Sequence, residues 1–112
     1  MRTVLFMFFS TCALSACDGS YKLTGKVYEV QPSLDKVPID SVRVSVYIGG
    51  DWFRGKTYSD STGNFSKMDL STPTKATYYF IFQKAGFRID TIIREAEKGR
   101  AEFEIEHQMQ RQ

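Results

Sequence analysis

Hydrophobic and polar residues alternate along most of the chain after residue 20, a pattern typical of strands that bury one face. The clearest run spans residues 42–48, where valine or isoleucine occupies every even position. Similar runs separated by turn residues predict strands at 21–30, 42–48, 52–58, 64–70, 77–83, 87–93 and 101–106. We therefore expect an all-β fold, a seven-stranded antiparallel β-sandwich made of two packed sheets.

The third predicted strand carries the candidate binding surface. A tight turn at Gly49-Gly50 or Gly50-Asp51 joins it to the second strand, and either turn leaves the same side chains on each face. Burying Arg54 and Lys56 without partners would cost several kcal/mol per charge, so we expect Phe53 and Thr57 inside. The outward face then gathers aromatic and cationic side chains: Tyr47, Trp52, Arg54, Lys56 and Tyr58. Because such residues are enriched at binding hot spots, this face either contacts a protein or glycan or shields the edge of a sheet.

The chain has 112 residues, of which 42% are hydrophobic and 25% are charged, with a formal net charge of +2. This length suits one domain, and the apolar content is too high for a disordered chain. The nearly balanced charge and the lack of long basic runs argue against nucleic acid as a partner. We therefore expect one small folded domain that recognises something other than DNA or RNA.

The first 16 residues differ in kind from the rest of the chain. Arg2 is their only charge, and an apolar stretch of about ten residues follows it. A positive start, a short apolar stretch and a small-residue exit are typical of a secretory signal peptide. The stretch is too short for a transmembrane helix, which needs roughly 20 apolar residues. We expect residues 1–16 to be removed after export.

The exit reads Leu14-Ser15-Ala16-Cys17 and resembles the bacterial lipobox. The resemblance implies that signal peptidase II cuts before Cys17 and that this cysteine carries a lipid anchor. Cys12 would leave with the signal peptide, so the mature chain would contain no disulfide. The expected organisation is a signal peptide at 1–16, a lipid-anchored tether at 17–20, the sandwich at 21–108 and a tail at 109–112. Asp18 favours the inner membrane in enteric bacteria only, so both the inner and the outer membrane stay open.

Short motifs follow one another along the mature chain: Leu23-Thr24-Gly25-Lys26-Val27, Val37-Pro38-Ile39, Val42-Arg43-Val44-Ser45-Val46, Thr57-Tyr58-Ser59-Asp60-Ser61-Thr62-Gly63-Asn64-Phe65 and Lys84-Ala85-Gly86-Phe87. In this order and spacing they resemble the carboxypeptidase regulatory-like domain, a transthyretin-like (prealbumin-like) sandwich, over roughly residues 21–93. Asp40-Ser41 departs from that family, which often has glycine before the second strand. The resemblance implies an accessory module of the kind attached to peptidases, outer-membrane transporters and envelope proteins.

Candidate chemistry is sparse. His107 lacks a second histidine or a cysteine partner, so we expect an exposed terminal histidine and no zinc site. The transthyretin-like fold also hosts 5-hydroxyisourate hydrolase, but this chain lacks the several histidines and the C-terminal Tyr-Arg-Gly-Ser of that enzyme. Asp60-Ser61-Thr62-Gly63 suits a type I turn capped by Asp60 rather than a calcium loop. We expect no catalytic residues, no metal, no cofactor and no enzymatic activity.

The leading hypothesis is a lipid-anchored cell-envelope protein whose non-catalytic sandwich binds or scaffolds another envelope component. It would contact the membrane through the lipid on Cys17, and an envelope protein or glycan through Tyr47, Trp52, Arg54 and Tyr58. The alternative is a carbohydrate-binding envelope lipoprotein that uses the same outward aromatic face, since flat aromatic rings also stack on sugars.

Overall fold

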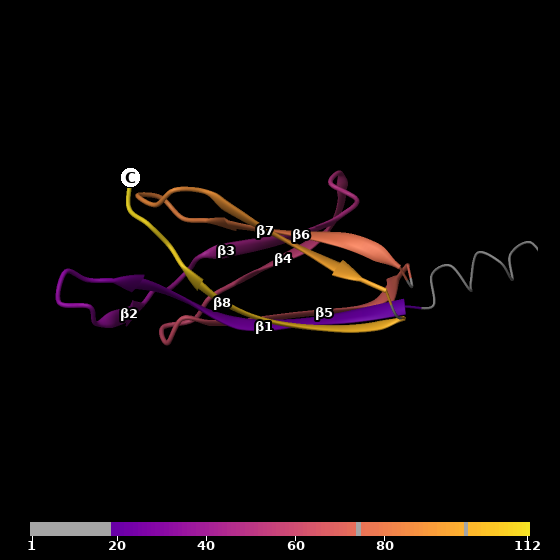
Figure 1. Cartoon of the computed structure of the whole chain (residues 1–112), viewed down its shortest axis with the longest axis horizontal. Coiled ribbons are helices and arrows are strands. Elements are labelled where there is room, and N and C mark those ends of the chain that lie inside the picture. The colour runs from indigo at the N-terminus through magenta and orange to yellow at the C-terminus, as the bar shows by residue number, and fades with distance from the viewer. Residues whose placement is uncertain (1–18, 74, 98) are drawn as a thin grey trace, which may run out of the picture.

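Two four-stranded sheets pack face to face in the computed structural model of the chain, which describes residues 19–73, 75–97 and 99–112 (Figure 1). In chain order the strands are β1 (Gly19–Val30), β2 (Lys36–Pro38), β3 (Arg43–Ile48), β4 (Trp52–Tyr58), β5 (Asn64–Thr72), β6 (Ala76–Gln83), β7 (Asp90–Ala96) and β8 (Arg100–Gln108). The prediction of an all-β sandwich is confirmed. There are eight strands rather than seven, because β2 forms where the sequence indicated only a loop.

The first sheet is built around β1, which pairs with three other strands. β5 and β2 run antiparallel to β1, whereas β8 runs parallel to it, from Ser20 opposite Arg100 to Tyr28 opposite Gln108. This parallel pair departs from the expected fully antiparallel arrangement. It arises because the chain crosses from β7 in the second sheet to β8 in the first beside the start of β1, so both strands set out from the same end (Figure 1).

The second sheet has the order β4-β3-β6-β7, and all its neighbouring strands are antiparallel. The inward residues expected at 42–48 are all buried: Val42, Val44, Val46 and Ile48. β6 lies in the middle of the sheet, as its apolar run indicated. Its alternate residues Tyr79 and Ile81 are only half-buried, so one face of this sheet is less covered than the sequence suggested.

The core between the sheets is rich in aromatic side chains. Its largest fully buried members include Tyr21 and Leu23 of β1 and Tyr78, Phe80 and Phe82 of β6. A glycine in β1 makes room for one further ring, because a Cβ at Gly25 would lie 2.7 Å from the ring of Phe65. Gly25 is paired with Phe65 in the same sheet, so the ring of Phe65 fits against β1 only because β1 carries no side chain there.

Both ends of the expected domain extend further than the sequence indicated. β1 begins at Gly19, inside the expected tether. After β8, Met109 is buried and Arg111 pairs with Glu29, so the expected tail at 109–112 packs against the sandwich. The expected signal peptide and the lipid site Cys17 lie outside the described residues. No helix in the described part of the chain has the length and apolar character needed to cross a bilayer.

Candidate functional site

A β-bulge in β4 decides which side chains of the candidate surface share a face. The register of β3 and β4 shifts after Val46, so that Val46 faces Gly55 but Tyr47 faces Phe53. Gly55 has a φ of 133°, and a Cβ there would lie 2.7 Å from the side chain of Lys67. Glycine therefore permits the extra residue that the shift requires.

The bulge reverses the expected faces at the start of β4. Phe53, expected inside, is 49% exposed and packs on Tyr47, with the ring centroids 5.3 Å apart. Trp52, expected outside, lies opposite the buried Ile48 and so belongs to the inner side. Tyr58 remains outside and is 48% exposed. The expected contact face is therefore split, because two-residue alternation cannot hold across an inserted residue.

Arg54 also turns inward and connects the two sheets at their edges. Its Nε and Nη2 atoms donate to Oδ2 of Asp69 on β5, at 2.9 and 2.6 Å, and the two side chains are only 18% and 15% exposed. The guanidinium lies 4.3 Å from the ring centroid of Trp52, so a cation–π contact covers the ion pair. Neither the exposure of Phe53 nor the role of Asp69 was expected from the sequence. The available signal was Gly55, since a glycine inside a strand often marks a bulge.

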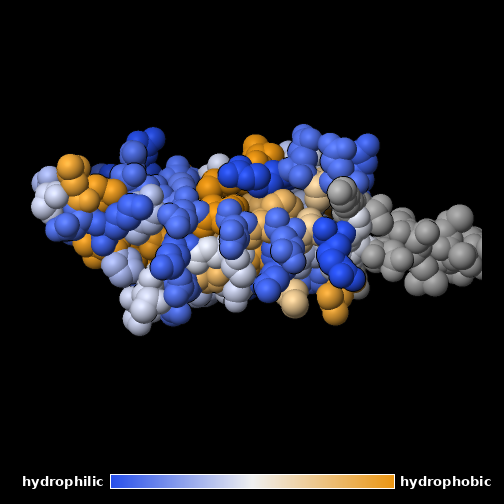
Figure 2. All heavy atoms as spheres, turned by 60° about the horizontal axis from the view of Figure 1, so that its bottom comes forward, coloured by the Kyte–Doolittle hydropathy of each residue, from blue (hydrophilic) through white to orange (hydrophobic). Residues whose placement is uncertain are grey.

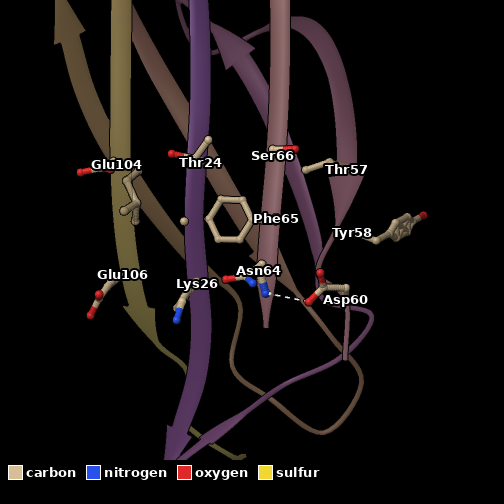
Figure 3. A pocket seen from close by; sticks show the side chains of 12 residues that line it. Thr24, Lys26, Thr57, Tyr58, Asp60, Asn64, Phe65, Ser66, Glu104 and Glu106 are labelled. Atoms are coloured by element: carbon tan, nitrogen blue, oxygen red, sulfur yellow. Dashed lines mark hydrogen bonds between the residues drawn. The ribbon is translucent and has the colours of Figure 1, made fainter. Parts of the chain in front are cut away.

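A hollow of about 810 Å³ extends from β8 across β1 and β5 to the end of β4 (Figure 3). The side chains on its open side are mostly polar: Thr24, Lys26, Asn64, Ser66, Glu104 and Glu106. Tyr58 lies at the edge of the hollow, on the strand that carries the bulge. Hydroxyl, ammonium and carboxylate groups side by side are suited to hydrogen bonding with a polar ligand.

Asp60 forms the turn that the sequence indicated at the rim of this hollow. Its carboxylate accepts hydrogen bonds from the Thr62 hydroxyl at 2.7 Å and from the backbone N–H of Thr62 at 2.9 Å. It also accepts one from the backbone N–H of Asn64 at 3.0 Å (Figure 3). These bonds, the one from the Thr62 hydroxyl first, hold the pKa of Asp60 below its ordinary value. The carboxylate therefore serves the turn, and it is charged at neutral pH.

His107 is less exposed than expected. Its side chain is 14% exposed, its Nε2 atom lies 3.1 Å from Oδ2 of Asp90, and its ring centroid lies 4.6 Å from that of Phe82. The correction follows from β8 continuing to Gln108, which holds His107 within the sandwich instead of at a free end. Within residues 19–73, 75–97 and 99–112, no three His, Cys, Asp or Glu side chains are grouped closely enough to hold a metal ion.

The chain shares its fold with parts of larger proteins. No family model and no curated protein matches it. Hydroxyquinol 1,2-dioxygenase from Pseudomonas putida DLL-E4 is similar over 88% of this chain and 59% of its own, with a TM-score of 0.61 and 12% identity. The Bacillus anthracis TIE protein gives a TM-score of 0.58 and 16% identity over 83% of this chain and 18% of its own. (S)-allantoin synthase gives a TM-score of 0.54 and 10% identity over 82% of this chain and 41% of its own.

These likenesses correct the expectation that the chain is not an enzyme. That expectation rested on the resemblance to an accessory domain and on the lack of familiar catalytic motifs. The solved structures with the same fold include a dioxygenase and (S)-allantoin synthase, so this fold is one that enzymes use. At 10–12% identity the likeness to these enzymes establishes the fold alone, and this chain spans less than two thirds of either one.

Proposed function

We propose that this chain is a lipid-anchored protein of a bacterial cell envelope, attached through Cys17, whose sandwich binds another envelope component. The observation that carries the proposal is the distance along the chain between the lipobox and the fold. Cys17 is two residues before Gly19, the first residue of β1. A lipid at that position would leave almost no spacer between the membrane and the sandwich. The resemblance to carboxypeptidase regulatory-like domains, modules found on envelope proteins, supports the same proposal.

Fatty-acid labelling tests the anchor, with the second cysteine as a matched control. Cells that express the full chain with an alkyne-bearing fatty acid should label the wild type and the Cys12→Ser variant. Cys17→Ser should lose the label and leave the membrane fraction, because the thiol of Cys17 is the proposed acylation site. A label that persists in Cys17→Ser, or disappears in Cys12→Ser alone, contradicts the proposal.

The proposed binding surface is the outer face of β3 and β4 around Tyr47 and Phe53. These two rings pack together there, and Lys56 and Tyr58 on the same face are exposed. Aromatic rings beside a cation form the kind of centre that dominates protein interfaces. In-cell cross-linking with mass spectrometry should identify a partner that Phe53→Ser loses. Ile89 lies in the connection between β6 and β7 and is 61% exposed, so the control variant Ile89→Ser should keep the cross-linked partner.

Carbohydrate binding is a second candidate function. Because the bulge separates Trp52 from the other aromatic side chains, the candidate sugar site is Trp52 alone. Trp52 is 42% exposed and its ring lies beside the ion pair of Arg54 and Asp69, so apolar and polar groups suited to a sugar are adjacent. Because Trp52 is the only tryptophan, its fluorescence reports directly on this position. Titration with envelope glycans should change that fluorescence, and a spectrum that stays constant up to millimolar glycan counts against this candidate.

A further inference from the structure

The start of β1, the end of β5 and the β3–β4 turn lie at one end of the sandwich, here called the β1-start end (Figure 1). Strand pairing places Gly19 opposite Thr72, the last residue of β5. Across the layers, the rings of Tyr21 and Tyr78 lie 5.2 Å apart. Tyr78 is paired with Ile48, the last residue of β3, which is paired in turn with Trp52.

This end exposes large apolar side chains. Leu70 is 74% exposed and Met68 58%, both on β5, and Trp52 is 42% exposed on the neighbouring β4. In Figure 2 apolar spheres protrude at the lower right, towards the end of the molecule where β1 begins. Met68 and Leu70 lie on the outward side of β5, and Trp52 lies across the edge from them, since it stacks on Arg54, the partner of the intervening Asp69. Exposed apolar side chains near one another are typical of a surface that contacts a partner or a membrane.

The length of chain before β1 indicates what that surface meets. Two residues separate Cys17 from Gly19, and an extended chain covers at most about 7 Å over two residues. Leu70 is two residues from Thr72, the partner of Gly19. A lipid on Cys17 would therefore hold Leu70 within reach of the headgroup region, whichever way the short connection turned.

The charges around this end are of both signs. Lys22, Lys75 and Arg100 are exposed, and so are Asp51, Glu97 and Glu102. Attraction to anionic lipids would therefore be weak, and apolar contact has to supply the binding. Tryptophan, leucine and methionine are suited to this, because an indole ring is favoured at the boundary between headgroups and acyl chains.

We propose that the β1-start end docks on the bilayer surface, with Trp52, Met68 and Leu70 at the boundary between headgroups and acyl chains. The inference rests on the proposed lipid anchor at Cys17 and adds a fixed orientation to it. The sandwich then stands on its β1-start end, and its opposite end, with β2 and the C-terminus, points away from the membrane (Figure 1). The outer face around Tyr47 and Phe53 stays accessible from the side.

Quenching of Trp52 fluorescence tests the docking directly. The full-length lipoprotein, purified from cells, is reconstituted into phosphatidylcholine vesicles with brominated acyl chains, and the lipid on Cys17 is verified by mass spectrometry. We expect a blue-shifted Trp52 spectrum, quenching by bromine and protection from aqueous iodide. Because the charges are mixed, replacing a third of the lipid by phosphatidylglycerol should change the quenching little.

Two leucines at opposite ends of the sandwich provide matched variants. Leu70→Asn should lower the ratio of docked to undocked protein roughly fivefold, as expected for partial burial of one leucine side chain. Leu34 is 81% exposed beyond the other end of β1, so Leu34→Asn should leave the quenching unchanged. Equal effects of the two substitutions overturn the proposed orientation.

The remaining outcomes separate the two proposals. A chain that carries the lipid and stays on the vesicles, but whose Trp52 is not quenched, overturns the docking and leaves the anchor standing. A chain without lipid on Cys17 that fails to bind the vesicles overturns the anchor, and the docking with it.

Discussion

The two ends of the sandwich are joined by different interactions. At the β1-start end the layers meet through aromatic rings, since the centroid of Tyr78 lies 5.2 Å from that of Tyr21 and 5.1 Å from that of Phe103. At the opposite end, called the polar end, Phe82 packs on Phe65 and His107 across the layers, and a polar contact is added, since His107 of one sheet lies 3.1 Å from Asp90 of the other. The β1-start end therefore depends on ring packing together with the Arg54–Asp69 ion pair, and the polar end adds a histidine–carboxylate contact.

The polar end is closed by the last residues of the chain. The backbone N–H of Met109 donates to the carbonyl oxygen of Tyr28 at 2.9 Å, and that of Gln112 donates to the carbonyl oxygen of Gly86 at 3.1 Å. The first bond attaches the segment to β1 and the second to the connection between β6 and β7. Residues 109–112 therefore link β1 to the connection between β6 and β7 at this end, in addition to the ring contacts of Phe82.

The largest expected loss of stability comes from weakening the packing of residues 109–112 against the sandwich. Met109 is 1% exposed, so Met109→Ala should lower the free energy of unfolding by about 3 kcal/mol, the usual cost of such a cavity. Chemical denaturation measures the change, and Gln108→Ala, at an exposed neighbour, is the control. A loss below about 1 kcal/mol for Met109→Ala would mean that the C-terminal segment does not hold this end together.

The role of this segment could be predicted from the sequence only in part. Gln110, Arg111 and Gln112 are exposed, so their polarity correctly indicated a surface position. What the sequence does not show is that backbone groups, and the single apolar side chain of Met109, attach the segment to both sheets. Backbone hydrogen bonds between distant segments depend on the fold and leave no pattern in neighbouring residues.

The next effect tests the ion pair between Arg54 and Asp69 at the β1-start end. Arg54→Met leaves the partly buried Asp69 without this partner and should cost about 2 kcal/mol, below the range for fully buried pairs. Adding Asp69→Leu should recover part of the loss, because the partly buried carboxylate that has lost Arg54 is then gone. Arg43→Met, at an exposed arginine bonded to Gln83, is the control. A double variant as unstable as the single one would contradict this account.

The Arg54–Asp69 ion pair also shows how far the sequence predicts which face of a strand each side chain occupies. Alternation placed β3 correctly, because no residue is inserted in it, and it still holds for Lys56 and Tyr58 of β4. From the bulge at Gly55 back to Trp52 every side chain is on the other face. Arg54 was expected outside because no partner for it could be seen in the sequence. Its partner Asp69 lies on a different sheet, and local spacing does not reveal such a pair.

A gain in stability should follow from changing Tyr21. Its hydroxyl is buried without a hydrogen-bond partner among the described residues, so Tyr21→Phe should raise the free energy of unfolding by about 1 kcal/mol. Burial, and secondarily the charge of Asp69, raises the pKa of Tyr21 above its ordinary value of 10.0. The unfolded chain therefore ionises first, and stability falls as the pH rises above 10.

Denaturation at increasing pH checks both parts of this prediction. Tyr21→Phe should be more stable than the wild type at pH 7, and its alkaline loss of stability should be smaller. Tyr58→Phe, at an exposed tyrosine, is the control and should leave the profile unchanged. If Tyr21→Phe were less stable than the wild type, its hydroxyl would have to bind a buried water, and the β1-start end would be less apolar than the structure indicates.

The smallest effect belongs to Asp60, at the polar end. Hydrogen bonds hold its pKa below the ordinary 3.8, so its contribution to stability is present above that pH and is lost as the pH falls through the folded-state pKa. Asp60→Ala should therefore lower the melting temperature slightly at pH 7 and flatten the acid side of the profile. Asp51→Ala, at an exposed aspartate of the β3–β4 turn, should do neither. Equal acid profiles for the two variants would mean that the hydrogen bonds of Asp60 add no stability at the polar end. The contrast between the two ends would then rest on Met109 and His107 alone.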